Sequence, residues 1–142
     1  VVGTGAAKAD GTSNRYEAAA IPAVPDHEVL STLVGSAEDR DEVVHVGPIG
    51  TDDAYYAETE AIVAEWEAAG LTAVEMEAAA IFTLARRKGL SAGAICTIDG
   101  NLVAGTQKGE GEGELPPKAK NNVERAIGIA LDAVARLDDG RE

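Results

Sequence analysis

Two glutamates separated by one residue stand where an apolar run gives way to small residues, in Val74-Glu75-Met76-Glu77-Ala78-Ala79. We expect a buried strand to end here and a helix to begin, which places Glu75 and Glu77 at the junction. A carboxylate at such a place is costly to desolvate unless donors or a ligand satisfy it, although the helix dipole helps one in the first turn. The pair therefore predicts either a ligand site or, as the plain alternative, a helix that starts at Glu77 while Glu75 points to solvent.

Three other segments carry residue types suited to binding. Asp10-Gly11-Thr12-Ser13-Asn14-Arg15-Tyr16 offers hydroxyls, an amide and a guanidinium that suit an anion or a ligand hydroxyl. Thr51-Asp52-Asp53-Ala54-Tyr55-Tyr56 ends on two rings, Tyr55 and Tyr56, that can stack on a flat heterocycle. Asp99-Gly100-Asn101 offers an acid and an amide able to read the edge of a base. Taken singly, each segment fits a polar turn or a packing role equally well.

Several common kinds of site are missing from the sequence. It contains no phosphate-binding P-loop, no dinucleotide-binding glycine pattern, no metal-ligand cluster and no Ser/His/Asp signature, so we expect no metal and no bound cofactor. The single cysteine, Cys96, lies in the apolar run Ala94-Ile95-Cys96-Thr97-Ile98 and cannot form an internal disulfide. We expect a buried structural thiol and a reducing compartment.

The composition predicts one acidic α/β domain with a core of small aliphatic residues, because 45% of the 142 residues are hydrophobic and only 4% aromatic. The formal net charge of −13 repels polyanions and argues against a nucleic-acid partner. Because the acidic residues are spread along the whole chain, the composition favours a protein adapted to a salt-rich cytoplasm over an ordinary acidic protein. The start Val1-Val2-Gly3 has no basic signal region and no run approaches about 18 apolar residues, so we expect neither export nor membrane insertion.

Apolar runs and the breakers between them predict alternating strands and helices. We expect strands over 1–7, 43–46, 71–76 and 91–98, helices over 27–37, 58–69, 78–88 and 116–137, and loops over 8–15, 47–56 and 99–115. This alternation is typical of a three-layer α/β/α sandwich with a mostly parallel or mixed central sheet. Ligand sites in such sheets lie at the carboxyl ends of the strands.

In this order, the four segments resemble the nucleoside phosphorylases of the uridine phosphorylase and hexameric purine nucleoside phosphorylase type. The Glu-Met-Glu element at Glu75 to Glu77 is the strongest match, and the similarity runs from Val1 to the closing helix. Within the family the chain looks like a uridine phosphorylase of the kind found in halophilic archaea. The resemblance implies that phosphate, as co-substrate, displaces a base from C1′ of a ribonucleoside to give ribose 1-phosphate.

The resemblance also implies roles for individual residues. Glu77 would hold the 2′ and 3′ hydroxyls of the ribose, Met76 would contact the apolar face of the sugar, and Tyr55 would pack on the base. Asp99 matches an aspartate that donates a proton to the base in the purine enzymes. The candidate catalytic residues are Glu77 and Asp99, and the candidate substrate-binding residues are Tyr55, Tyr56, Val74, Glu75, Met76, Glu77 and Asn101.

The resemblance to the family says least about which base the enzyme prefers. Bacterial uridine phosphorylases read uracil with a Gln and an Arg where this chain has Ala57-Glu58-Thr59-Glu60-Ala61, and the purine enzymes have Ser-Asp where it has Thr97-Ile98-Asp99-Gly100. Because Gly105-Thr106-Gln107 resembles the uridine branch, we expect uridine. The alternatives are a purine nucleoside or methylthioadenosine phosphorylase, a nucleosidase that uses water, and a binding module without chemistry.

The family's phosphate-binding loop and arginines would precede Val1. We therefore expect residues 1–142 to be the C-terminal portion of a single phosphorylase-like domain and to be inactive alone. The resemblance implies that the full-length enzyme is a cytoplasmic homo-hexamer.

Overall fold

A parallel sheet lies at the centre of the computed structural model, which describes residues 1–106 and 117–140. In these residues three strands pair in the order β1 (Val2–Lys8), β2 (Val46–Thr51) and β3 (Ala73–Glu75). Thr51 is the register partner of both Lys8 and Glu75. The three strands consequently end level with one another, and their carboxyl ends form one edge.

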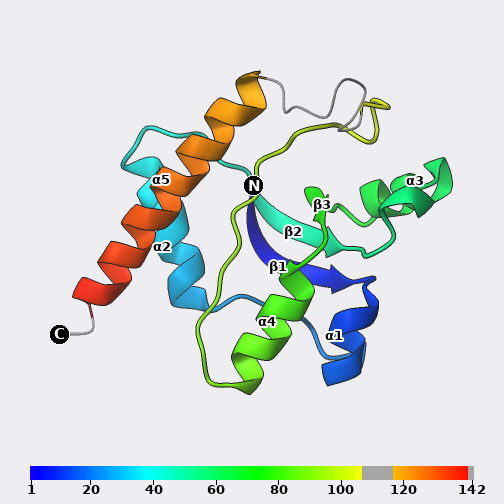
Figure 1. Cartoon of the computed structure of the whole chain (residues 1–142), viewed down its shortest axis with the longest axis horizontal. Coiled ribbons are helices and arrows are strands. Elements are labelled where there is room, and N and C mark those ends of the chain that lie inside the picture. The colour runs from blue at the N-terminus through cyan, green and yellow to red at the C-terminus, as the bar shows by residue number, and fades with distance from the viewer. Residues whose placement is uncertain (107–116, 141–142) are drawn as a thin grey trace.

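Helices cover both faces of this sheet (Figure 1). The pair α1 (Gly11–Tyr16) and α4 (Ala78–Arg87) packs on one face, and α2 (His27–Glu38) packs with α5 (Pro117–Asp139) on the other. A 3-10 turn over Tyr55–Ala57 leads into α3 (Glu60–Ala68), which lies beyond β3. The predicted three-layer α/β/α arrangement is confirmed. No helix of the described ranges is long and apolar enough to cross a membrane.

Two apolar clusters hold the layers together, and small side chains dominate both. The cluster under α4 contains Ala6, Ala23, Ile49, Ala78, Ala79 and Phe82, and the cluster under α2 and α5 contains Val2, Leu33, Ala37, Ile129 and Ala133. Phe82 is the largest fully buried side chain among the described residues. The expected small-residue core is present.

The strand predicted over 43–46 is wrong, because the chain pairs only from Val46 onward and Val43 is 88% exposed. The true strand contains glycine and proline, which sequence rules count against strands. Packing favours glycine at the first of its two glycine positions, since a Cβ on Gly47 would come within 2.1 Å of the Thr72 hydroxyl. Pairing with β1 and β3, which no local pattern reveals, places β2 here.

The polar loop predicted over 8–15 contains a short helix, α1. Asp10 is 3% exposed and caps it, because one carboxylate oxygen accepts from the Ser13 amide and the other from the Ser13 hydroxyl at 2.6 Å. Aspartate is one of the preferred N-cap residues of helices. Of the groups expected to meet an anion, the Ser13 hydroxyl and the Asn14 amide bond to Asp10 instead.

The strand predicted over 91–98 is also wrong. Ile95 makes a single antiparallel bridge to Val2, and the Gly3 amide donates to the Ala94 carbonyl at 3.1 Å. Ala23 bridges Ala6 on β1, so the segment meets only the beginning of that strand. The helix predicted over 116–137 is present as α5. Residues 107–115 of the loop predicted over 99–115, and residue 116 of that helix, lie outside the described part of the chain.

Candidate active site

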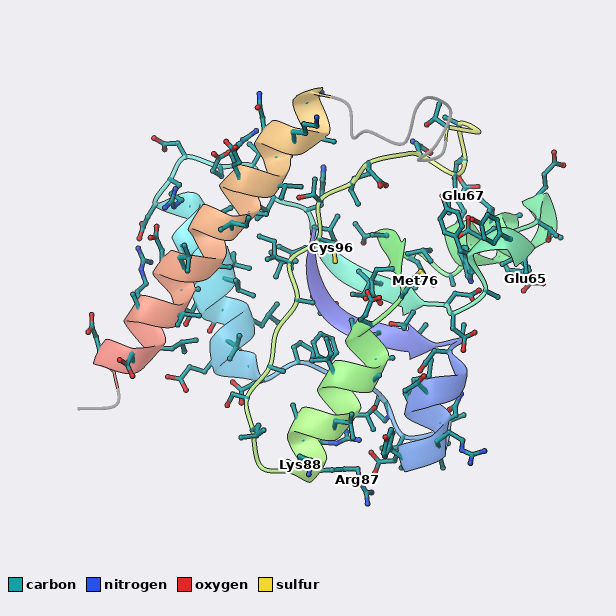
Figure 2. All side chains as sticks on the ribbon, in the orientation of Figure 1. Glu65, Glu67, Met76, Arg87, Lys88 and Cys96 are labelled. Atoms are coloured by element: carbon teal, nitrogen blue, oxygen red, sulfur yellow. The ribbon has the colours of Figure 1, made fainter. Side chains whose placement is uncertain are left out.

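A cleft of about 720 Å³ opens at the carboxyl edge of the sheet, between β3, α3 and the segment 96–106. Its walls include every predicted site residue except Tyr56, namely Tyr55, Val74, Glu75, Met76, Glu77, Asp99 and Asn101. Figure 2 shows Met76 near the end of β3, Glu67 on α3 and Cys96 on the segment that passes the start of β1. Residues 77 and 99, which are far apart in the sequence, therefore share one cavity.

Glu75 does not point to solvent, because its carboxylate caps the start of α4. One oxygen accepts from the backbone amides of Glu77 at 2.8 Å and Ala78 at 2.7 Å. The other accepts from the hydroxyl of Thr51, which itself accepts from the Ala79 amide at 2.9 Å. Four hydrogen bonds thus tie the ends of β2 and β3 to the first turn of the helix.

Glu77 occupies the N-cap position of α4, with its φ at −132° and its ψ at −29°. Its side chain makes no capping hydrogen bond and is exposed on the wall of the cleft. The alternative interpretation, in which a helix starts at Glu77, is therefore correct for the position of its backbone. The carboxylate of Glu77 has no hydrogen-bond partner among the described residues. Such a group is available to a ligand.

The cleft is acidic on several sides. Asp52 and Glu58 line it together with Glu77 and Asp99, and no Lys or Arg occurs among its described lining residues. Partial burial, with a smaller contribution from the charge of Asp52, raises the pKa of Glu58. The carboxylate of Glu77, which makes no side-chain capping bond, favours a ligand that brings hydroxyl donors or a positive centre.

Cys96 lies deeper in the same cleft and is partly buried. Burial raises the pKa of its thiol, and the charges of Glu75 and Glu77 act in the same direction. The thiol is therefore protonated near neutral pH, as expected for a structural cysteine.

An apolar wall formed by Val63, Trp66 and Leu71 was not predicted as part of the site. The first two lie in the helix predicted over 58–69, at a spacing typical of a core-facing stripe, and both are only half-buried. The helical pattern is real, but α3 turns this face toward the cleft. The only sequence signal that this helix could line the site was the position of Trp66 soon after the aromatic pair Tyr55 and Tyr56.

The remaining predicted groups are placed less directly. Tyr56 is 99% exposed and touches Tyr55 edge to face, with ring centroids 5.2 Å apart. The side-chain oxygen of Asn101 accepts from the Ala104 amide at 3.0 Å, so it also stabilises its own turn. Gln107, which was used to favour uridine, lies outside the described residues.

The segment from Asp10 to Tyr16 does not line the cleft. Its Gly11 amide donates at 2.8 Å to the carboxylate of Asp53, which follows the lining residue Asp52 in the sequence. In the described ranges no group of three or more His, Cys, Asp or Glu side chains is arranged to hold a metal ion. That no metal or cofactor takes part stays a prediction.

Comparison with known sequences extends this agreement. Residues 1–136 match the family model described as the phosphorylase superfamily. Over 138 residues the chain is 64% identical to a guanosine phosphorylase of Halorubrum lacusprofundi, covering 96% of this chain and 57% of that protein. It is 32% identical over 148 residues to a uridine phosphorylase of Treponema pallidum, covering 96% of this chain and 55% of that protein.

A solved structure of a P knowlesi homolog of P falciparum PNP superposes with a TM-score of 0.82 at 26% identity. The match covers 98% of this chain and 54% of that one. The chain therefore spans about half the length of the proteins that it matches.

Proposed function

Because the chain belongs to the phosphorylase superfamily, we propose that it forms part of an enzyme that cleaves ribonucleosides with phosphate. A phosphate oxygen would bond to C1′ of the ribose as the glycosidic C1′–N bond breaks, and the electron pair of that bond would leave with the base. The products would be the free base and ribose 1-phosphate, which makes the enzyme a pentosyltransferase.

The observation that carries this proposal is the state of the Glu77 carboxylate. It lines the cleft without a hydrogen-bond partner among the described residues, whereas Glu75 beside it is fully engaged. Two vicinal hydroxyls of a ribose would each donate a charge-assisted hydrogen bond to such a group. The same negative charge would stabilise the positive charge that develops on the sugar as the glycosidic bond breaks.

The other lining residues suit the remaining parts of a nucleoside. Met76 is 44% exposed beside Glu77 and would contact the sugar, while Tyr55, Val74 and Trp66 would surround the base. Asp99 would donate a proton to the departing base. Phosphate would be held by groups other than the described cleft residues, since none of those is cationic.

The two candidate bases rest on different observations. Uridine was predicted from the sequence, and the chain has a uridine phosphorylase among its relatives. The guanosine phosphorylase relative shares 64% of its residues over 96% of this chain, which supports a purine. We therefore propose guanosine as a second substrate to be tested against uridine.

The test is an assay of a polypeptide that contains this chain and spans the full length of its relatives. Loss of uridine or guanosine that requires added phosphate or arsenate is the expected result. Turnover in phosphate-free buffer would indicate a nucleosidase. Binding without turnover in either buffer would indicate a module without chemistry and would overturn the proposal.

Several whole-protein properties stay proposals of the same kind. They are a homo-hexameric assembly, a cytoplasmic location, adaptation to a salt-rich cytoplasm and the inactivity of residues 1–142 on their own. The acidic composition, with a net charge of −13, and the relative from Halorubrum lacusprofundi support the salt adaptation.

A further inference from the structure

We infer that Thr51 is a positioning residue, which acts through Glu75 to fix the backbone from which Glu77 reaches into the cleft. This inference rests on the proposed function, because it assigns Thr51 a part in the same reaction. Thr51 itself does not line the cleft, so it would act on the substrate only through other residues.

Thr51 stands at the meeting point of the elements that form the site. It ends the central strand β2, pairs in register with Glu75 and is 0% exposed. Its hydroxyl donates to the Glu75 carboxylate and accepts from the Ala79 amide at 2.9 Å. The one hydroxyl therefore joins the end of β3 to the start of α4.

Glu75 continues this connection to Glu77. Its second oxygen accepts from the amides of Glu77 and Ala78, at 2.8 Å and 2.7 Å. The first amides of a helix have no partner within the helix and need one from outside. Thr51 and Glu75 supply these partners in place of the N-cap side chain, since that of Glu77 makes no capping bond.

The arrangement leaves Glu77 with a fixed backbone and an unused carboxylate. Ala78 and Ala79, the next two residues, are 2% and 0% exposed, so the helix is also anchored in the core just after Glu77. Removing the Thr51 hydroxyl would leave a buried amide without an acceptor and one Glu75 oxygen without its donor. The first turn of α4, and with it Glu77, would lose its fixed position relative to the strand ends.

The chain offers a closely matched control for this substitution. Thr83 lies on the buried face of α4 and, like Thr51, is 0% exposed. Unlike that of Thr51, its hydroxyl has no hydrogen-bond partner among the described residues. Thr83→Val removes the same group at the same burial. The two variants differ in whether the lost hydroxyl was bonded to the site.

The experiment measures kcat and KM in the full-length polypeptide for Thr51→Val, Thr51→Ser and Thr83→Val. We expect Thr51→Val to lower kcat by up to about 100-fold, because a displacement of about 1 Å at a reacting centre costs that much. Thr51→Ser, which keeps the hydroxyl, should restore most of the rate, and Thr83→Val should leave kcat unchanged.

A double-mutant cycle separates positioning from general destabilisation. In a Glu77→Gln background, Thr51→Val should have little further effect on kcat, because the group that it positions is already lost. Full additivity of the two effects would overturn the inference, as would a Thr51→Val enzyme that is folded and as fast as the wild type.

Amide hydrogen exchange supplies a readout that does not depend on activity. Thr51→Val should speed exchange at Ala79 and Ala78 while leaving amides near Thr83 protected. If the wild-type protein turns over no nucleoside, the proposed function fails whatever the exchange shows. If it is active while exchange at Ala79 is unchanged in Thr51→Val, only the inference about Thr51 fails.

Discussion

The α2–α5 layer and the cleft at the carboxyl edge both carry acidic side chains, but they use them differently. In the α2–α5 layer three acids are paired with arginines, in Asp39–Arg136, Glu42–Arg125 and Arg40–Asp132. In the cleft, Glu77 and Asp99 take part in no ion pair among the described residues. Acids of the first kind belong to the fold, whereas acids of the second kind are available to a ligand.

The difference indicates where a substrate would contribute binding energy. Paired, exposed carboxylates cost the protein little, because each partner and the solvent compensate them. Acids gathered around a cleft repel one another, and burial, with a smaller contribution from Asp52, raises the pKa of Glu58. A ligand with hydroxyl donors would pair with the carboxylate of Glu77.

The largest expected effect that tests this comparison comes from Glu77→Gln. The substitution keeps the size of the side chain but removes the charge, so kcat/KM should fall by about 100-fold or more. Because Glu77 makes no side-chain capping bond, the midpoint of urea unfolding should stay the same. Steady-state kinetics and urea denaturation of the full-length protein check the two halves of this prediction.

Glu65→Gln is the matched control, since Glu65 is exposed on α3 and does not line the cleft. Its kinetics should equal those of the wild type. Equal losses in the two variants, or unfolding of Glu77→Gln, would place Glu77 with the acids that belong to the fold.

A smaller effect is expected where an acid serves the α2–α5 layer. Asp26 caps α2, because its carboxylate accepts from the amides of Glu28 at 2.9 Å and Val29 at 3.1 Å. Asp26→Ala should lower the free energy of unfolding by about 1 kcal/mol without changing kinetics. The hydrogen bond from the Val29 amide is the main cause that lowers the pKa of Asp26 below its ordinary value of 3.8.

The sign of this shift sets the pH dependence. A lowered pKa in the folded state means that the stabilisation is present above about pH 4 and is lost as the pH falls through the folded value. The difference between wild type and Asp26→Ala should therefore shrink in acid. Asp26→Asn, which keeps a capping oxygen without the charge, should remain stable at neutral pH, and a loss as large as that of the alanine variant would contradict the capping role.

The smallest effect is expected at the ion pairs. Arg125 contacts Glu42, and one hydrogen bond of this pair runs from Arg125 Nε to the carboxylate at 2.7 Å. Arg125→Gln should cost at most about 1 kcal/mol, and less in high salt, because the Arg125 side chain is 53% exposed. Urea denaturation at two salt concentrations measures this loss. A fall in the catalytic rate of Arg125→Gln would contradict the proposal that the ion pairs of the α2–α5 layer serve the fold and not the reaction.

Most of the layer arrangement was predictable from the sequence. Apolar spacing and the Asp26 cap predict α2, and the apolar spacing after Glu77 predicts α4. The strands were harder, because β2 contains Gly47, Pro48 and Gly50 and is placed by its pairing with β1 and β3. The apolar run around Ile95 reads as a strand, but only the first part of the β1 edge is available to it. Pairing between distant segments decided both cases.

For the site, the sequence predicted which segments of the chain meet. The rule that strand ends form the site and the Glu-Met-Glu resemblance pointed to Glu75 and Glu77, which line the cleft. Asp99 lines it too, although the segment before it is not a strand. The hydrogen bond between Thr51 and Glu75 was not predictable, because it depends on the register of two strands 24 residues apart. Trp66 was missed since an amphipathic helix does not show whether its apolar face meets a core or a cavity.

The most direct test of the central claim compares wild type and Glu77→Gln on a ribonucleoside and on its 2′-deoxy analogue. If the Glu77 carboxylate accepts from the ribose hydroxyls, Glu77→Gln should lose far more kcat/KM on the ribonucleoside than on the analogue. The same loss on both substrates, or no loss on either, would contradict a role for Glu77 in holding the sugar.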